Sequence, residues 1–210
     1  MAARNKNKQA SKFLFYFAIA LLVISLAVFF MNVDKFFKIT GKAIGTANLT
    51  ISSVTSINFT TNNINWGTGA VASGQSNATL NTAYNNASNV TKGNWTGNTA
   101  GLVIENIGNI NVSILIKSGV NAATLLGGNG PEYQYNFSDS AESGSCSFNA
   151  TTVEGTFYDA NTTDRQVCNN LAIDQSTDTL RIDVKLVIPS NSKTGAIGDI
   201  VTATATASGL

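Results

Sequence analysis

The stretch TLRIDVKLVIP, residues 179–189, alternates apolar and polar side chains. Its apolar members are separated by three charged ones, the two sets being Leu180, Ile182, Val184, Leu186 and Ile188 against Arg181, Asp183 and Lys185. Alternation with period two places successive side chains on opposite faces of a strand. We therefore expect a strand that buries the apolar set and leaves the charged set solvated, ending at Pro189, where a missing N–H is tolerated.

The same period recurs on both sides of this stretch. INVSILI alternates Ile110, Val112, Ile114 and Ile116, and VTATATA alternates Val201, Ala203, Ala205 and Ala207 with threonines. Shorter alternating runs lie at residues 49–59 and 132–137, and Gly- and Asn-rich segments separate them. Gly108 lies in the turn of a hairpin over residues 101–116, where we expect a positive φ. Residues 121–126, NAATLL, suit a single helical turn.

Many short strands joined by turns are typical of an all-β sandwich. We predict an Ig-like or jelly-roll-type antiparallel β-sandwich over residues 47–210, preceded by one N-terminal transmembrane or signal helix. The length after residue 46 suits a single domain.

The N-terminal region has a different composition. Residues 1–12 form a basic tail, and the 19 residues 13–31 contain Ser25 as their only polar member. A helix of that length is about 28 Å long at about 1.5 Å per residue, close to the thickness of a bilayer core. A cleaved signal peptide has a shorter apolar region and a nearby small-residue site. We favour a retained membrane anchor followed by a short stalk at residues 32–46.

Charge is sparse and unevenly placed. Charged residues make up 12% of the chain, against about 25% in typical soluble domains. The basic residues concentrate in residues 1–45, on either side of the apolar segment, which fits a membrane surface. The remaining chain is mildly acidic, and this excludes a nucleic-acid partner, which would need clustered Lys and Arg.

Ten Asn-X-Ser/Thr motifs follow the apolar segment. They are candidate N-glycosylation sites, which place a domain outside the cytoplasm when occupied. Their asparagines are Asn48, Asn58, Asn77, Asn86, Asn89, Asn94, Asn111, Asn136, Asn149 and Asn161. The alternative is that Asn and Thr are simply common in the turns and strands of a polar β-protein.

Cys146 and Cys168 are the only cysteines, and neither belongs to a CxxC pair. A zinc or redox motif is therefore missing from the sequence. In an external compartment the two thiols are expected to form a disulfide. Two unrelated buried thiols are the alternative.

Three segments together resemble surface proteins of small-genome archaea and, more distantly, TasA-like fibre subunits. They are INWGTGAV (residues 64–71), ENIGNINVSI (residues 105–114) and the ending IPSNSKTGAIGDIVTATATA (residues 188–207). The archaeal proteins also have an N-terminal apolar segment followed by a stalk similar to ITGKAIG here. The resemblance implies an external β-sandwich, and it carries over no catalytic residue.

The sequence offers little for catalysis. It contains no histidine, which removes Ser-His-Asp catalysis and imidazole metal ligation. We predict no cofactor and no metal, although two acidic loops have oxygen ligands that suit calcium: Asp159, Asn161 and Asp164 in one, Asp174 and Asp178 in the other. Ordinary Asx turns explain these loops more simply. Trp66, Tyr84 and Trp95 could form a sugar-binding platform or pack in the core.

We therefore expect a non-enzymatic cell-surface structural protein, anchored in the cell membrane through residues 13–31 with its domain facing the extracellular side. Self-assembly into a coat would suit this role. One alternative is a subunit of an extracellular filament or pilus, in which either the apolar helix packs in a fibre core or residues 47–59 complete a neighbour's sheet. The other is an adhesin or carbohydrate-binding module with glycan ligands.

Overall fold

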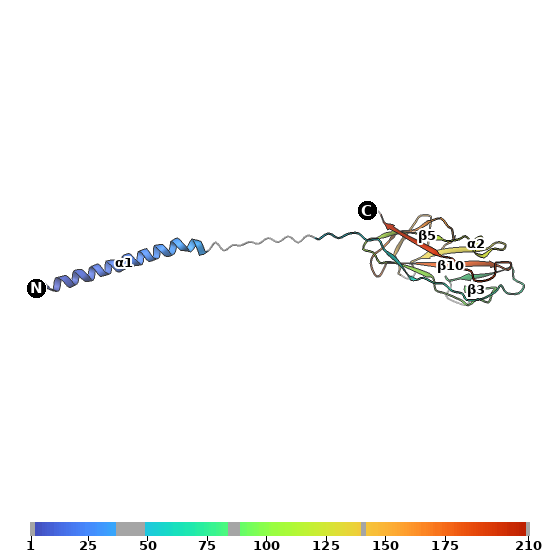
Figure 1. Cartoon of the computed structure of the whole chain (residues 1–210), viewed down its shortest axis with the longest axis horizontal. Helices are drawn as coiled ribbons and strands as arrows, with labels where there is room; N and C mark the ends of the chain where they lie inside the picture. The colour runs from blue at the N-terminus through green and yellow to red at the C-terminus, as the bar shows by residue number, and fades with distance from the viewer. Residues whose placement is uncertain (1–2, 37–48, 84–88, 140–141, 209–210) are drawn as a thin grey trace. The chain divides into compact units, whose positions relative to one another are not determined.

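The computed structural model describes residues 3–36, 49–83, 89–139 and 142–208 (Figure 1). The chain divides into two compact units, Met1–Thr50 and Ile51–Leu210. The first unit contains helix α1 (Ala3–Phe36), which includes the apolar segment 13–31. Within the described part of the chain, no helix is both long and apolar enough to cross a membrane. Residues 37–46 of the predicted stalk lie outside the described residues.

The second unit is mostly β, as predicted, and its strands pair in an antiparallel manner. The described strands are β1 (Ile57–Thr61), β2 (Asn77–Asn81), β3 (Val90–Thr91), β4 (Leu102–Asn106), β5 (Val112–Ser118), β6 (Glu132–Ser138), β7 (Cys146–Phe148), β8 (Phe157–Asp159), β9 (Arg165–Leu171), β10 (Thr179–Pro189) and β11 (Val201–Ala207). A short helix α2 (Ala122–Leu126) forms the predicted turn, and the side chain of Asn121 caps it by accepting from the Thr124 N–H.

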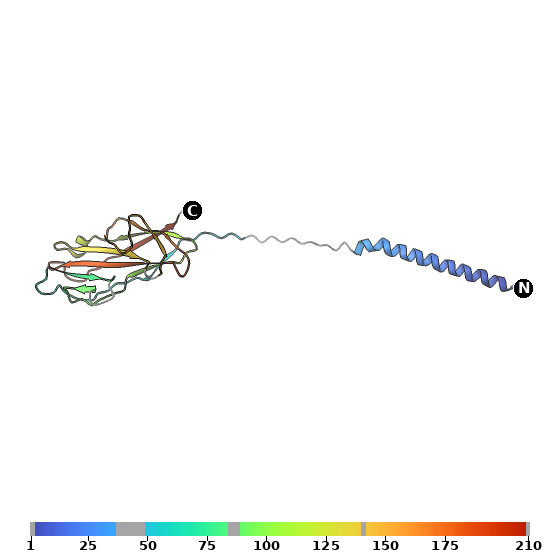
Figure 2. The same cartoon turned by 180° about the vertical axis from the view of Figure 1, so that it is seen from behind.

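The strands form two sheets. One has seven strands, with the path β1-β4-β10-β2-β3 and with β6 and β8 joined through β10, and the other has the order β11-β5-β9-β7. Strand β10 is central to the larger sheet, and it is the long orange strand in Figures 1 and 2. Along one side it pairs with β6, and along the other it pairs first with β4 and then with β2. Two partners thus divide one edge of β10 between them.

The core draws side chains from both sheets into one apolar cluster. Leu180, Ile182, Val184 and Ile188 of β10 are buried in it, and Leu186 packs against it half-buried. From the smaller sheet the cluster receives Val112, Ile114 and Ile116, whereas Ile110 lies before β5 and is half-buried. The predicted inward faces of both strands are therefore confirmed.

The turn between β4 and β5 holds both ends of the second unit. The buried Asn106 side chain donates to the carbonyls of Ile110, Leu171 and Ala172. Asn109 donates to the Ser52 carbonyl and accepts from the Val54 N–H. The Ser208 N–H donates to the Asn111 carbonyl. The incoming chain and the last strand therefore meet at one turn.

Gly108 in this turn departs from the prediction of a positive φ, since its φ is not positive. The glycine is needed for space instead. A Cβ atom at this position would lie 2.4 Å from the Val54 carbonyl oxygen. Close approach of the N-terminal segment, rather than left-handed backbone, therefore explains the residue.

Candidate functional site

A groove of about 840 Å³ lies between β6 and β8 of the larger sheet and β5 and β9 of the smaller one. Ile116, Tyr135 and Phe137 contribute buried or nearly buried apolar side chains to it. Polar side chains from the segment around β8 and β9 complete the lining, among them Asp159 and Asn161. The groove thus combines apolar side chains with amides, hydroxyls and carboxylates.

The charged groups of the groove are engaged with neighbours. The Arg165 guanidinium lies 4.3 Å from the centre of the Tyr158 ring, which suits a cation–π contact. Lys117 Nζ lies 3.8 Å from Asp164 Oδ1, and Gln134 donates to Asp159 Oδ1 over 3.0 Å. Such an arrangement can accept a hydroxyl-rich ligand through aromatic rings and planar polar groups.

The two tryptophans do not form an open platform. Both are half-buried and pack against the core cluster. The Trp95 ring fills the space beside two glycines, because a Cβ at Gly69 would lie 2.4 Å from the ring and one at Gly93 would lie 2.7 Å from it. Packing therefore accounts for both rings, and Tyr84 lies outside the described residues.

The two acidic loops behave as turns. Among the described residues, no group of three or more His, Cys, Asp or Glu side chains is arranged to hold a metal ion. Asp174 accepts from the Ser176 N–H and hydroxyl, and these hydrogen bonds lower the pKa of its carboxyl. Asp178 is buried, and burial, with nearby Glu142 and Glu105, raises the pKa of its carboxyl.

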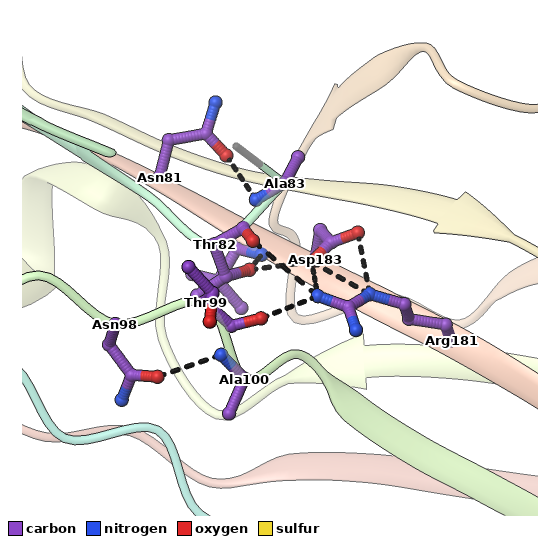
Figure 3. A network of polar contacts seen from close by, with 9 residues as sticks. Asn81, Thr82, Ala83, Asn98, Thr99, Ala100, Arg181 and Asp183 are labelled. Atoms are coloured by element: carbon purple, nitrogen blue, oxygen red, sulfur yellow. Dashed lines mark hydrogen bonds and ion pairs between the residues drawn. The ribbon is translucent and has the colours of Figure 1, made fainter. Parts of the chain in front are cut away.

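An ion pair between half-buried Arg181 and buried Asp183 contradicts part of the predicted solvent face of β10. Asp183 is only 4% exposed, and the Arg181 guanidinium donates to both its carboxylate oxygens over 2.8 and 3.0 Å. Thr82 Oγ1 donates to the same carboxylate over 2.8 Å. The expectation that Asp183 is solvated is therefore wrong, because segments about a hundred residues earlier cover this part of the strand (Figure 3).

This network lies at the point where β4 and β2 part along β10. Arg181 also donates to the Thr99 carbonyl over 2.7 Å. Two Asx turns shape the covering segments, Asn81 accepting from the Ala83 N–H and Asn98 from the Ala100 N–H. Figure 3 shows the guanidinium group between these two turns. The charged pair thus closes a gap in the sheet, which is a structural role.

A second polar cluster links the two sheets at the start of β11. The Tyr133 and Tyr135 hydroxyls are 2.6 Å apart, and Tyr133 donates to Asp199 Oδ2 over 3.1 Å. The Gly119 N–H donates to the same carboxylate. Burial raises the pKa of both tyrosines, so both stay neutral. Sequence reasoning missed this cluster, because no motif relates Asp199 to strand β6.

The predicted disulfide is present. Cys146 of β7 and Cys168 of β9 lie on neighbouring strands, with their Cα atoms 5.7 Å apart. Both cysteines are buried, Cys168 completely. In the chain-entropy model a loop of this size contributes about 3 kcal/mol to stability.

The sequon asparagines differ widely in exposure. Asn58, Asn94 and Asn161 are exposed, and Asn77, Asn111 and Asn149 are half-buried. Asn89 and Asn136 are 7% and 8% exposed, so a glycan could not be attached to them in the folded domain without local opening. Asn48 and Asn86 lie outside the described residues. Asn149 and Asn161 line the groove.

Comparison of the chain with models of protein families, with curated proteins and with solved structures finds no match.

Proposed function

We propose that this protein is a non-enzymatic structural component of a cell surface, anchored in the membrane by residues 13–31, with its β domain facing outward and N-glycosylated. In this proposal the two sheets form an Ig-like or jelly-roll-type sandwich, because one apolar cluster receives side chains from both. The resemblance to archaeal surface proteins supports the same role.

The disulfide is the observation that carries the proposal. Disulfides persist in oxidising compartments and are rare in the cytosol. A bond between two buried cysteines on neighbouring strands is part of the fold rather than a surface redox switch. The apolar segment 13–31 then supplies the attachment that would keep such a domain at the membrane from which it was exported.

Glycosylation is supported by the exposed sequons. Asn58 lies on β1, Asn94 follows β3 and Asn161 follows β8, so glycans on them would project from separate parts of the domain. Bulky, solubilising glycans would offset a surface with few charges.

A structural role also fits the polar groups of the domain. The Arg181–Asp183 pair of β10 contacts Thr82 and Thr99 of the covering segments, and the Tyr133–Tyr135–Asp199 cluster links β6 to the residues before β11. In the groove, Lys117 contacts Asp164 and Arg165 contacts the Tyr158 ring. Catalysis needs groups held ready for a substrate, and these groups are occupied in holding the fold.

Protease added to intact cells tests the topology. We expect loss of the domain from the outside, while a cytoplasmic control protein stays intact. Fractionation should leave the uncut chain in the membrane. A domain that resists protease until the cells are lysed would contradict the proposal.

A glycan-binding role is the second candidate, favoured by the groove. Its aromatic and planar polar side chains suit a neutral oligosaccharide, which presents both hydroxyls and apolar ring faces. Titration of the purified chain with neutral oligosaccharides should then show saturable binding that Tyr158→Ala abolishes and Thr206→Ala leaves unchanged. Equal binding by both variants, or none by the native chain, would reject this candidate.

A further inference from the structure

The described sheet edges differ in how well they are protected from pairing. Strands β3, β7 and β8 have two or three residues, and the register of β1 is interrupted between Phe59 and Thr61. Strand β11 has seven residues, all paired in unbroken register with β5, and neither charge nor proline. Short strands, bulges, charges and prolines are the usual protection of an edge. Strand β11 is the described edge without any of them.

The free backbone groups of β11 can be assigned to particular residues. The Ile200 carbonyl accepts from Gly119 and the Ser208 N–H donates to Asn111, so even-numbered residues direct their backbone toward β5. Antiparallel strands alternate this direction from one residue to the next. Val201, Ala203, Ala205 and Ala207 therefore direct their N–H and C=O groups outward, and these make no hydrogen bond to another described residue.

The five central residues of β11 read the same in both directions. Residues 202–206 are Thr-Ala-Thr-Ala-Thr, which is symmetric about Thr204. If a second copy of the strand paired antiparallel around that residue, Thr204 would face Thr204, Thr202 would face Thr206, and Ala203 would face Ala205. The outward backbone groups would then meet in hydrogen-bonded pairs, and the Thr204 pair would be a non-hydrogen-bonded one.

The side chains suit this pairing on both faces. The threonines are exposed on the outer face, where Thr–Thr cross-strand pairs are favourable. On the inner face Val201, Ala203 and Ala205 are half-buried against the core, so a second copy would shield them further. Ile200, 77% exposed, would gain Ser208 of the second copy as its neighbour.

We propose that β11 is a self-association edge, through which two copies of this chain join their smaller sheets about a two-fold axis at Thr204. The β11 edge is then the contact through which the proposed surface protein assembles. The inference depends on the proposed function only for the place of assembly, which is the membrane surface. Pairing of single strands buries less than the roughly 1,200 Å² of a stable interface. The contact is therefore weak in dilute solution, and a shared membrane raises its effective concentration.

Cysteine cross-linking of the full chain in native membranes tests the register. In the proposed dimer the two Thr204 Cα atoms are about 4.5 Å apart, within the range for a disulfide. The two Thr202 Cα atoms are offset by four residues, about 13 Å. Under a mild oxidant, Thr204→Cys should form at least tenfold more dimer than Thr202→Cys or Thr206→Cys alone, and Thr202→Cys mixed with Thr206→Cys should form a mixed dimer.

Two further measurements keep the test decisive. Peptide mapping must show an intact Cys146–Cys168 bond in each variant, which identifies folded protein. Adding Ala205→Pro to Thr204→Cys removes an outward N–H without touching the β5 ladder, and should abolish the cross-link. Equal cross-linking at residues 202 and 204, or no cross-link in folded Thr204→Cys, would overturn the inference. Preferential cross-linking of Thr204→Cys to Ile51→Cys would also overturn it, because it would place the N-terminal segment, rather than a second β11, beside the strand. The protease result for topology is independent of all three.

Discussion

Strands β10 and β11 have the same alternating pattern and different places in the domain. Strand β10 has hydrogen-bonded neighbours on both sides and buries Leu180, Ile182 and Val184 completely or nearly so. Strand β11 has one neighbour, and its inward side chains are only half-buried. The large aliphatic side chains of β10 need covering from several directions, whereas the alanines of β11 need little. Side-chain size within the pattern therefore separates a central strand from an edge.

The largest difference in stability between the two strands is expected for substitutions at their inward-facing positions. Val184→Asp would bury an unpaired carboxylate in β10 and should lower the free energy of unfolding by about 3–5 kcal/mol. Ala205→Asp places the same group at the half-open edge, where water can reach it, and should cost on the order of 1 kcal/mol. Thermal melts of both variants make the comparison, and equal shifts would remove the distinction between the two strands.

The next difference concerns the outer faces. Arg181→Met would leave Asp183 buried without its partner, so we expect a loss of about 3 kcal/mol. Thr204→Met changes an exposed residue of β11 and should stay within about 0.5 kcal/mol. Denaturant unfolding measures both. A loss below 1 kcal/mol for Arg181→Met would show that water or another group compensates Asp183.

Glycines near the two strands give a smaller effect. A Cβ at Gly101 would lie 2.9 Å from both Asp183 Oδ1 and the Ile182 carbonyl oxygen, so Gly101→Ala should cost about 1–3 kcal/mol through overpacking. Gly198, just before β11, has open space around it, and Gly198→Ala should be nearly neutral. The same melts compare the pair, and a neutral Gly101→Ala would mean that the covering segment shifts freely.

The smallest effect is the pH dependence contributed by Asp178, directly before β10. Its raised pKa means that the folded state binds this proton more tightly than the unfolded state. Stability from this group therefore falls as pH rises from the ordinary carboxyl range through the raised pKa. As the pH is lowered from 7 to 4, the free energy of unfolding of the native chain should therefore increase relative to that of Asp178→Asn. A difference that does not change with pH would contradict this assignment.

Local pattern predicted β1, β4, β5, β6, β10 and β11, and the inward faces of β5 and β10. It did not predict β2, β3, β7, β8 or β9, and the alternation expected at Leu49 and Ile51 is wrong, since both residues are exposed and lie outside any strand. The pattern also predicted the turn at α2, and the disulfide followed from a chain with only two cysteines. Asp183 was misplaced because residues 82 and 99, which cover it, are distant in the sequence. The sharing of β10 between β4 and β2, and the burial of Asn89 and Asn136, are likewise products of tertiary packing that no local motif records.

The groove was foreseen only in part. Its loop residues Asp159, Asn161 and Asp164 were singled out for their oxygen atoms. Tyr158 and Arg165 were not, because β8 is short and β9 lacks clear alternation. Their contact arises from the folding of β9 beside the larger sheet, and a spacing rule cannot supply it.

Glycopeptide mapping of the chain from native membranes tests the central claim most directly, because it reports location and fold together. An outward-facing domain with this structure should carry glycans on exposed asparagines, among Asn58, Asn94 and Asn161, and none on the buried Asn89 and Asn136. A chain without any glycan would contradict the external location in a glycosylating cell. Full occupancy of Asn89 or Asn136 in folded protein would contradict the fold.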